Sequence, residues 1–200
     1  NSSLEAQVAN LADEIAHYSH DLDDGIEAVL LSETKLRREV KLWAGAARRT
    51  KRDHGELPDE CRRYFIIRCL IDDHVRDVVT TSEASIAAAG VKSADAVRLH
   101  AKPLVRYSDA RRKLNLELRK YLYQNLYYSK AVHEPHMRAT QMLEDLFHHL
   151  LKHRKDSDVQ TRRWARKEGW ERAVCDYLAG MTDRYAMAEH RRCIESGVDS

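Results

Sequence analysis

The sequence predicts an all-α protein, and three observations support that class. Gly and Pro, which interrupt helices, number only seven and three among the 200 residues. Apolar residues recur at intervals of three and four along most of the chain, as on a helix packed along one side. No segment alternates apolar and polar residues as a half-buried strand does. With 43% hydrophobic residues, the chain can bury one domain or a large part of a bigger one.

The first helix is predicted to begin at Ser3 and to reach the 23–25 region, where Gly25 is expected to bend it before residues 26–31 continue. One side is apolar, formed by Leu4, Val8, Leu11, Ile15, Tyr18, Leu22, Ile26 and Val29. At about 100° per residue, a polar stripe lies nearly opposite and carries Asp13, His17, His20, Asp21 and Asp24. A solvated helix face has the same pattern, so the stripe alone does not identify a site.

A break at residues 32–34 leads to a second predicted helix that carries Leu36, Val40, Leu42 and Trp43. The basic segment 48–58 is interpreted as a solvated connector, with a phosphate-binding patch as the alternative. Asp59 is predicted to cap a long helix over residues 60–89, which Gly90 ends. Its inward side chains are expected to be Phe65, Ile66, Leu70, Val75, Val78 and Val79.

Residues 93–97 are expected to form a short turn, and Ser108 to open the next helix. The aromatic run 121–128 resembles a base-stacking platform, but helical spacing favours a core role for Tyr121, Leu122 and Leu126. Another helix is predicted to start at residues 133–136, followed by a charged connector with a partial helix over 152–167. The last helix is predicted over Glu171–Glu195, with Gly180 inside it marking a close helix contact.

Charge and cysteine usage narrow the class of protein. The chain has 34 basic and 32 acidic side chains, so net charge alone favours neither nucleic acid nor membrane. It has no run of 18 apolar residues and no signal peptide pattern. The four cysteines, without a C-x-x-C pair, are predicted to be buried reduced thiols of a cytoplasmic protein, in preference to disulfides or a zinc site. The chain starts without Met, at a capping box formed by Ser2 and Glu5, so we expect it to be the later part of a longer protein.

Two histidine motifs have competing interpretations. His149 and His153 are one turn apart, but the Glu of an H-E-x-x-H zinc site is missing, so surface histidines are favoured over a metal site. The adjacent pair His20-Asp21 matches the His-Asp pair of metal phosphohydrolases only superficially, because the context of such a pair, a second histidine about one helix upstream and a distal aspartate downstream, is not visible. Paired Glu-x-x-His motifs of a carboxylate-bridged oxidase are absent.

Residues 4–16 (LEAQVANLADEIA) followed by residues 20–25 (HDLDDG) strongly resemble the bacterial dGTP triphosphohydrolases, a branch of the HD-domain superfamily. Residues 176–186 (DYLAGMTDRYA) resemble the C-terminal signature of the same family. The resemblance implies an HD-domain-type helical bundle, of which this chain would be the C-terminal part. Residues 1–31 would then be the last metal-site helix region, and residues 32–200 the C-terminal helical domain.

The family resemblance also implies roles for individual residues. Asp13 stands where the family has its distal metal-binding aspartate, for a divalent ion such as Mg²⁺, Mn²⁺ or another transition metal. His17 stands where the family usually has a tyrosine beside the substrate phosphates. Asp21 matches a carboxylate that contacts the sugar. Arg68 is a weaker candidate for substrate binding, because it lies in an arginine-rich helix that supplies such contacts in a related dNTPase.

The implied activity is metal-dependent hydrolysis of dGTP or another dNTP to a deoxynucleoside and triphosphate. The implied partners are the dNTP, the rest of the HD domain and further copies in a homo-oligomer, often a hexamer, with no membrane partner. The chain alone is expected to be inactive, since one aspartate does not make a metal site. The alternative is a non-catalytic helical module that binds nucleotide or nucleic acid, which the departure at His17 and the basic segment 48–52 favour.

Overall fold

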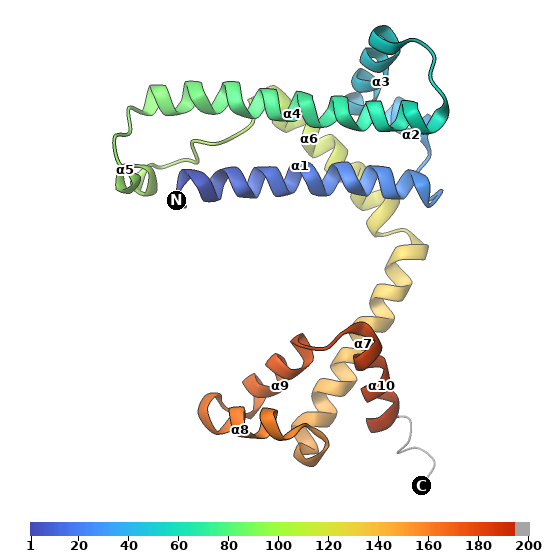
Figure 1. The fold of residues 1–200 in the computed structure, drawn as a ribbon, viewed down its shortest axis with the longest axis vertical. Coiled ribbons are helices and arrows are strands. Elements are labelled where there is room, and N and C mark those ends of the chain that lie inside the picture. Colours follow the sequence, from blue (N-terminus) through green and yellow to red (C-terminus); the bar gives the residue numbers. More distant parts are fainter. Residues whose placement is uncertain (195–200) are drawn as a thin grey trace. The chain divides into compact units, whose positions relative to one another are not determined.

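A computed structural model describes residues 1–194, and these residues form ten α-helices, one π-helix and one 3-10 helix without a strand. The predicted all-α class is therefore confirmed. The chain divides into two compact units, one over residues 1–129 and one from residue 130 onward (Figure 1). Within the described range, no helix is both long enough and apolar enough to cross a membrane. The predicted boundary after residue 31 concerns the domains of a longer protein and stays a prediction.

The first unit contains six α-helices and the π-helix. Their bounds are α1 Leu4–Glu27, α2 Glu33–Glu39, α3 Lys41–His54, α4 Asp59–Ala89, α5 Ala94–Leu99, α6 Asp109–Leu122 and the π-helix Tyr123–Tyr127. Helices α1 and α4 lie side by side in opposite directions (Figure 1). Arg63 near the start of α4 accordingly forms ion pairs with Asp23 and Glu27 near the end of α1, at 2.7 and 3.0 Å. The largest fully buried side chains of this unit include Leu22, Leu36, Trp43, Ile66, Leu70 and Leu122.

Most predicted helix ends are found at the serine and glycine residues that predicted them. The hydroxyls of Ser32, Ser93 and Ser108 each accept a hydrogen bond from a backbone N–H three residues on, which satisfies an otherwise unpaired donor. At the first helix this cap is Ser3, which accepts from Ala6, and the capping box predicted at Ser2 is wrong. Helix α4 ends as predicted at Gly90, whose φ of 59° is the left-handed conformation that glycine adopts readily.

Helix α1 differs from its predicted form at both ends. Val8 is 52% exposed, and the face there is instead filled by Gln7, whose Oε1 accepts hydrogen bonds from the backbone N–H groups of Leu104 and Val105 at 2.8 and 3.1 Å. The helix runs through Gly25 without a break and ends at Glu27, so Val29 lies beyond it and is 88% exposed. Gly25 serves close packing: a Cβ there would lie 2.7 Å from Leu31 Cδ1.

The predicted second helix is two helices, α2 and α3, separated by Val40 in an extended conformation. Residues 48–54 belong to α3, so the predicted connector is only 55–58. The physical reason is that Arg49 pairs with Asp72 and Asp73 of α4, at 2.8 and 2.5 Å, which fixes this basic stretch against a neighbouring helix. Two side chains of α4 that were expected to point inward, Val75 and Val79, are 45% and 48% exposed.

The second unit comprises α7 Lys130–Lys152, the 3-10 helix Arg154–Asp156, α8 Val159–Glu168, α9 Trp170–Ala179 and α10 Asp183–Cys193. Its core contains Leu150, Trp170 and Val174. Helix α7 begins three residues before the predicted start and contains Pro135. The predicted last helix is two helices, because the Thr182 hydroxyl caps α10 by accepting from the Tyr185 N–H. Gly180 is therefore an exposed helix end and not a close packing site, and Glu195 lies outside the described residues.

The four cysteines are free thiols, but their predicted burial is wrong for two of them. Cys61 and Cys175 are exposed, whereas Cys69 and Cys193 are half-buried. Cys61 and Cys175 lie on the outer sides of α4 and α9, where a small side chain is tolerated without contributing to the core.

Candidate functional site

The polar stripe on α1 is exposed, as the helical spacing predicts. Asp13, His17 and His20 are exposed, and Asp21 is half-buried. Within residues 1–194, neither Asp13 nor His20 forms a hydrogen bond or an ion pair. The Asp13 carboxylate is thus available to a ligand. A carboxylate that was already paired with an arginine of the same chain would not be.

Asp21 and His17 are joined to each other and to Tyr127. His17 Nε2 lies 3.3 Å from Asp21 Oδ2, and the Tyr127 hydroxyl donates a hydrogen bond to the same oxygen. The Tyr127 hydroxyl also lies 3.5 Å from His17 Nε2. Since both contacts are made to Oδ2, the other oxygen, Oδ1, has no partner in the described part of the chain. A carboxylate offers about four acceptor positions, so Asp21 can still accept from a ligand hydroxyl.

A π-helical turn brings Tyr127 to this position. The Tyr128 N–H donates to the Tyr123 carbonyl five residues back, at 3.1 Å, so the turn over residues 123–127 is one residue wider than an α-turn. Such turns are rare in proteins as a whole. Those that do occur are often found at functional sites. The core prediction for Tyr121, Leu122 and Leu126 is confirmed by their burial. Tyr127, however, was missed, because a wider turn changes which side chains share a face and leaves no mark in the spacing.

The Tyr127 side chain is supported by a row of aromatic and cationic contacts along α6. The Tyr123 ring meets the Tyr127 ring edge-on at 5.0 Å between centroids. The Arg119 guanidinium lies over the Tyr123 ring, 5.5 Å from its centroid. Burial, followed by the hydrogen bond to Asp21, raises the pKa of Tyr127 above that of a free tyrosine. Tyr127 is therefore a neutral hydrogen-bond donor at physiological pH.

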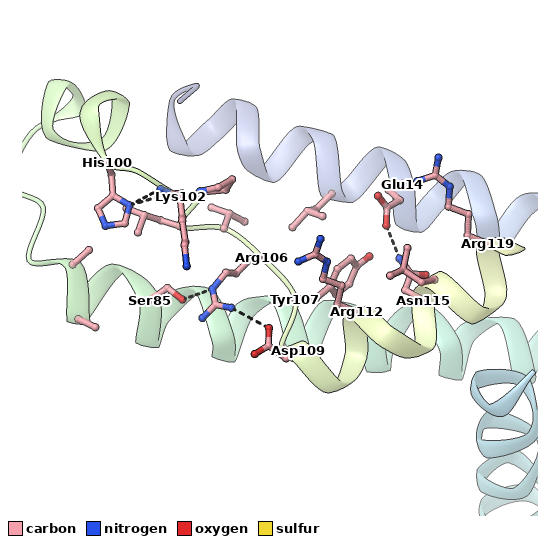
Figure 2. A pocket seen from close by; sticks show the side chains of 17 residues that line it. Glu14, Ser85, His100, Lys102, Arg106, Tyr107, Asp109, Arg112, Asn115 and Arg119 are labelled. Carbon is pink, nitrogen blue, oxygen red and sulfur yellow. Dashed lines mark hydrogen bonds and ion pairs between the residues drawn. The ribbon is translucent and has the colours of Figure 1, made fainter.

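A cleft of about 990 Å³ adjoins the stripe, between α1, α4, residues 100–107 and α6 (Figure 2). Four cations line it, at Lys102, Arg106, Arg112 and Arg119, together with His100. Only two carboxylates line it. Glu14 accepts a hydrogen bond from Asn115, and Asp109 lies 3.8 Å from Arg106 (Figure 2). The cleft therefore carries a positive excess, and such a surface attracts phosphate groups.

Arg119 is part of both features, since it lines the cleft and contacts Tyr123. Glu14 likewise lines the cleft from α1, about one turn before His17 of the stripe. The polar stripe and the cationic cleft are therefore neighbours along one helix, and a ligand larger than a single phosphate can reach both.

The structure does not bring Arg68 to the polar stripe. Its Nη1 donates to the Tyr64 hydroxyl at 2.9 Å, and its guanidinium lies 5.5 Å from the Tyr64 ring centroid. These contacts stay within α4 and leave the side chain exposed. The arginine of α4 that does contact α1 is Arg63. A substrate-binding role for Arg68 stays a prediction.

Asp13 suits a divalent metal as one ligand but does not complete a site. Carboxylate oxygens are preferred ligands of Mg²⁺ and Mn²⁺. Among residues 1–194, the single group of three metal-ligating side chains with mutually close ligand atoms is His149, Asp156 and Cys193, in the second unit. Further ligands for an ion at Asp13 would have to come from outside the described residues.

Residues 176–186 comprise the last turn of α9, the connecting residues 180–182 and the first turn of α10. Asp176 accepts from Trp164 Nε1 at 2.9 Å, and the hydroxyls of Tyr177 and Tyr185 lie 3.0 Å apart across the turn. These contacts fix the ends of two helices, and they support the structural role expected for this motif.

Comparison with known proteins finds one matching domain and a set of similar proteins. A model of the phosphohydrolase-associated domain matches residues 105–192. Deoxyguanosinetriphosphate triphosphohydrolase-like proteins are similar over nearly the whole chain. The Geobacter sulfurreducens protein is 37% identical over 196 residues, 96% of this chain, and the Bordetella pertussis protein is 38% identical over 195 residues, 98% of this chain. A Deinococcus radiodurans relative is 38% identical over 188 residues, 94% of this chain.

In each case the match covers 50% of the relative, so the chain spans about half the length of the curated relatives it matches. The names of these relatives and the matched domain indicate a phosphohydrolase-like role. The chain is a homologue of the deoxyguanosinetriphosphate triphosphohydrolase-like proteins, and it corresponds to their C-terminal half.

Proposed function

We propose that the chain is the C-terminal half of a metal-dependent dNTP triphosphohydrolase, which converts dGTP or another dNTP to a deoxynucleoside and triphosphate. The observation that carries the proposal is the polar stripe of α1 beside a cationic cleft, in which Asp13 has no partner among residues 1–194 and Asp21 is held by Tyr127. In this reaction water adds to the α-phosphorus, the bond to the sugar O5′ breaks, and O5′ leaves with a proton.

Asp13 would hold the divalent metal together with ligands from the other half of the protein. The metal, when bound, supplies Lewis acidity and lowers the pKa of a bound water. Because Asp13 is exposed and unpaired within the described residues, it needs no rearrangement to serve as a ligand.

Asp21 would orient the nucleotide. Its Oδ1 is available to accept a hydrogen bond from a sugar hydroxyl, while Tyr127 and His17 hold Oδ2. Tyr127 is then a positioning residue, which acts on the substrate through Asp21. His17 is about one helical turn closer to Asp13 than Asp21 is, and it can donate from a ring nitrogen to a phosphate oxygen.

The cationic cleft would balance part of the charge of the triphosphate. Arg119 is linked to the stripe through Tyr123, which packs on Tyr127, and Arg112 of α6 and Arg106 of residues 100–107 also line the cleft. Guanidinium groups suit this work, since they form paired hydrogen bonds to phosphate oxygens.

A non-catalytic module that binds nucleotide or nucleic acid is the second candidate, and the cationic cleft favours it because such a cleft needs no metal to bind phosphate. One experiment separates the two functions. Release of inorganic triphosphate is measured for the longer protein that carries these residues, with each of the four dNTPs and with Mg²⁺ or Mn²⁺. Hydrolysis of at least one dNTP that depends on the metal supports the enzyme. Nucleotide binding without any triphosphate release supports the module.

We propose a homo-oligomer, such as a hexamer, and a cytoplasmic location. Residues 1–200 alone should hydrolyse nothing, because α1 supplies one metal ligand. Triphosphate release by residues 1–200 alone would contradict the proposed division of the site between two halves.

A further inference from the structure

The second unit contains a group of three side chains that has no role in the proposed function and does not belong to the core of this unit. His149 lies on α7, Asp156 ends the 3-10 helix that follows, and Cys193 ends α10. Their ligand atoms, one imidazole nitrogen, one carboxylate oxygen and one sulfur, all lie within 4.8 Å of one another. His149 Nε2 and Asp156 Oδ2 are 2.7 Å apart.

We propose that His149, Asp156 and Cys193 form a Zn²⁺ site that ties α7 and the 3-10 helix to α10. The mixture of nitrogen, oxygen and sulfur ligands suits Zn²⁺, whereas Mg²⁺ and Ca²⁺ prefer oxygen alone. The site is separate from Asp13, which lies in the other unit.

The distances are close to those of a tetrahedral site. Zn²⁺ bonds of 2.0–2.3 Å place neighbouring ligand atoms about 3.3–3.8 Å apart. The ligand atoms of this group lie within 4.8 Å of one another, and the 2.7 Å hydrogen bond between His149 Nε2 and Asp156 Oδ2 would have to lengthen by about 0.6 Å to admit the ion. Three protein ligands leave a fourth position for water, as in zinc sites that are open on one side.

The surroundings favour a site that is partly shielded from solvent. The His149 side chain is 17% exposed, and Cys193 is half-buried. Within the described residues, the Cys193 thiol has no hydrogen bond that would compete with a metal ion. The nearest cation, Arg192, is engaged by Glu189 at 3.0 Å through Nε and by the Asp156 backbone carbonyl at 2.8 Å through Nη2. Arg192 thus orients the segment that carries Asp156 without occupying the Asp156 carboxylate.

The sequence favoured surface histidines at this place, because the Glu of an H-E-x-x-H motif is missing. In the structure, the residues grouped with His149 are Asp156 and Cys193, and not His153. His149 is joined by residues that lie 7 and 44 positions away along the chain, and His153 only stacks on its ring, at 4.4 Å between centroids. No pattern of spacing identifies a site assembled over such distances.

Cobalt is the probe that tests this site, because Co²⁺ replaces Zn²⁺ and a thiolate ligand gives a charge-transfer band that oxygen and nitrogen ligands do not. The 200-residue chain, reduced and free of metal, is titrated with Co²⁺, and Zn²⁺ is then added to displace it. We expect a thiolate band that saturates at one Co²⁺ per chain and disappears on addition of Zn²⁺. Absence of the band in the unmodified chain would overturn the proposal.

Matched variants assign the ligands. Cys193→Ser should remove the band, and His149→Gln should weaken Co²⁺ binding at least about tenfold, since even outer-shell changes cost that much at metal sites. Cys175→Ser and His148→Gln, which change exposed residues nearby, should leave both the band and the affinity unchanged. A band that persists in Cys193→Ser, or disappears in Cys175→Ser, would also overturn the assignment. The helical circular dichroism of each variant verifies that it is folded.

Discussion

The hydroxyl of Tyr127 donates a hydrogen bond to the carboxylate of Asp21, and this bond joins the π-turn after α6 to the polar stripe of α1. The two residues are 106 positions apart in the sequence. Because His17 contacts the same carboxylate oxygen, Asp21 is fixed from two directions and presents its other oxygen to solvent.

The first prediction concerns this bond. Tyr127→Phe removes the hydroxyl but keeps the ring that packs on Tyr123, so Asp21 loses its orientation and not its charge. A hydrogen bond to a charged group contributes about 1.5–3 kcal/mol, so kcat/KM of the longer protein should fall roughly tenfold or more. KM for the dNTP should rise while the metal dependence stays unchanged.

Tyr185→Phe is the matched control for Tyr127→Phe. It also deletes one hydroxyl contact, to Tyr177 in the second unit, and should leave kcat/KM unchanged. An equal loss of kcat/KM in both variants would mean that Tyr127 has no special connection with the site.

The second prediction concerns pH and His74, which is 4% exposed on α4. Burial lowers its pKa, and the nearby Arg111 adds to the effect, against opposing contributions from the Leu70 carbonyl, Asn115 and Asp73. The unfolded chain therefore binds a proton more readily than the folded one. The stability due to neutral His74 is present above a pH of about 6.5 and is lost as the pH falls below it.

Urea unfolding at pH 7.5 and 5.5 tests the role of His74. The chain should lose free energy of unfolding between these values, and His74→Gln should lose less over the same interval. His148→Gln, at an exposed position, should behave like the unmodified chain. The same pH dependence in all three proteins would show that His74 is not the responsible group.

The third prediction compares two helical glycines. A Cβ on Gly25 would meet Leu31 at 2.7 and 2.9 Å, so Gly25→Ala should cost about 1–3 kcal/mol in free energy of unfolding. A Cβ on Gly45 would meet nothing within 4 Å, so Gly45→Ala should stabilise α3 by up to about 1 kcal/mol. Urea midpoints of the two variants should move in opposite directions, and a stabilising Gly25→Ala would contradict the close packing against Leu31.

The sequence predicts the helical class and most helix ends because the causes are local. Ser108 caps a helix and Gly90 ends one whatever lies elsewhere in the fold. The break at Val40 is different, because it depends on how α2 and α3 pack as a pair, and no glycine or proline marks it. The buried Gln7 likewise depends on partners nearly 100 residues away.

At the candidate site, the sequence predicts the polar stripe of α1. The structure shows the residues beside it, Tyr127 and the cationic cleft. Helical spacing alone places Asp13, His17 and Asp21 on one side of α1. Tyr127 and the cationic cleft could not be predicted, because they require the register of α6 against α1 and a turn of π-helical width. The substrate-binding role of Arg68 stays a prediction, since its described contacts remain within α4.

The central claim is that Asp13 is a metal ligand of a dNTP triphosphohydrolase, and one variant pair tests it most directly. Release of inorganic triphosphate from dGTP is measured with Mn²⁺ for the longer protein and for its Asp13→Asn and His20→Gln forms. His20 is the control, since it shares the stripe and is also exposed. We predict that Asp13→Asn lowers the activity by more than about 100-fold and that His20→Gln leaves it unchanged. Loss of a residue that only positions a metal ligand costs about 10–100-fold, so loss of a ligand itself should cost more. Full metal-dependent turnover in Asp13→Asn would contradict the account.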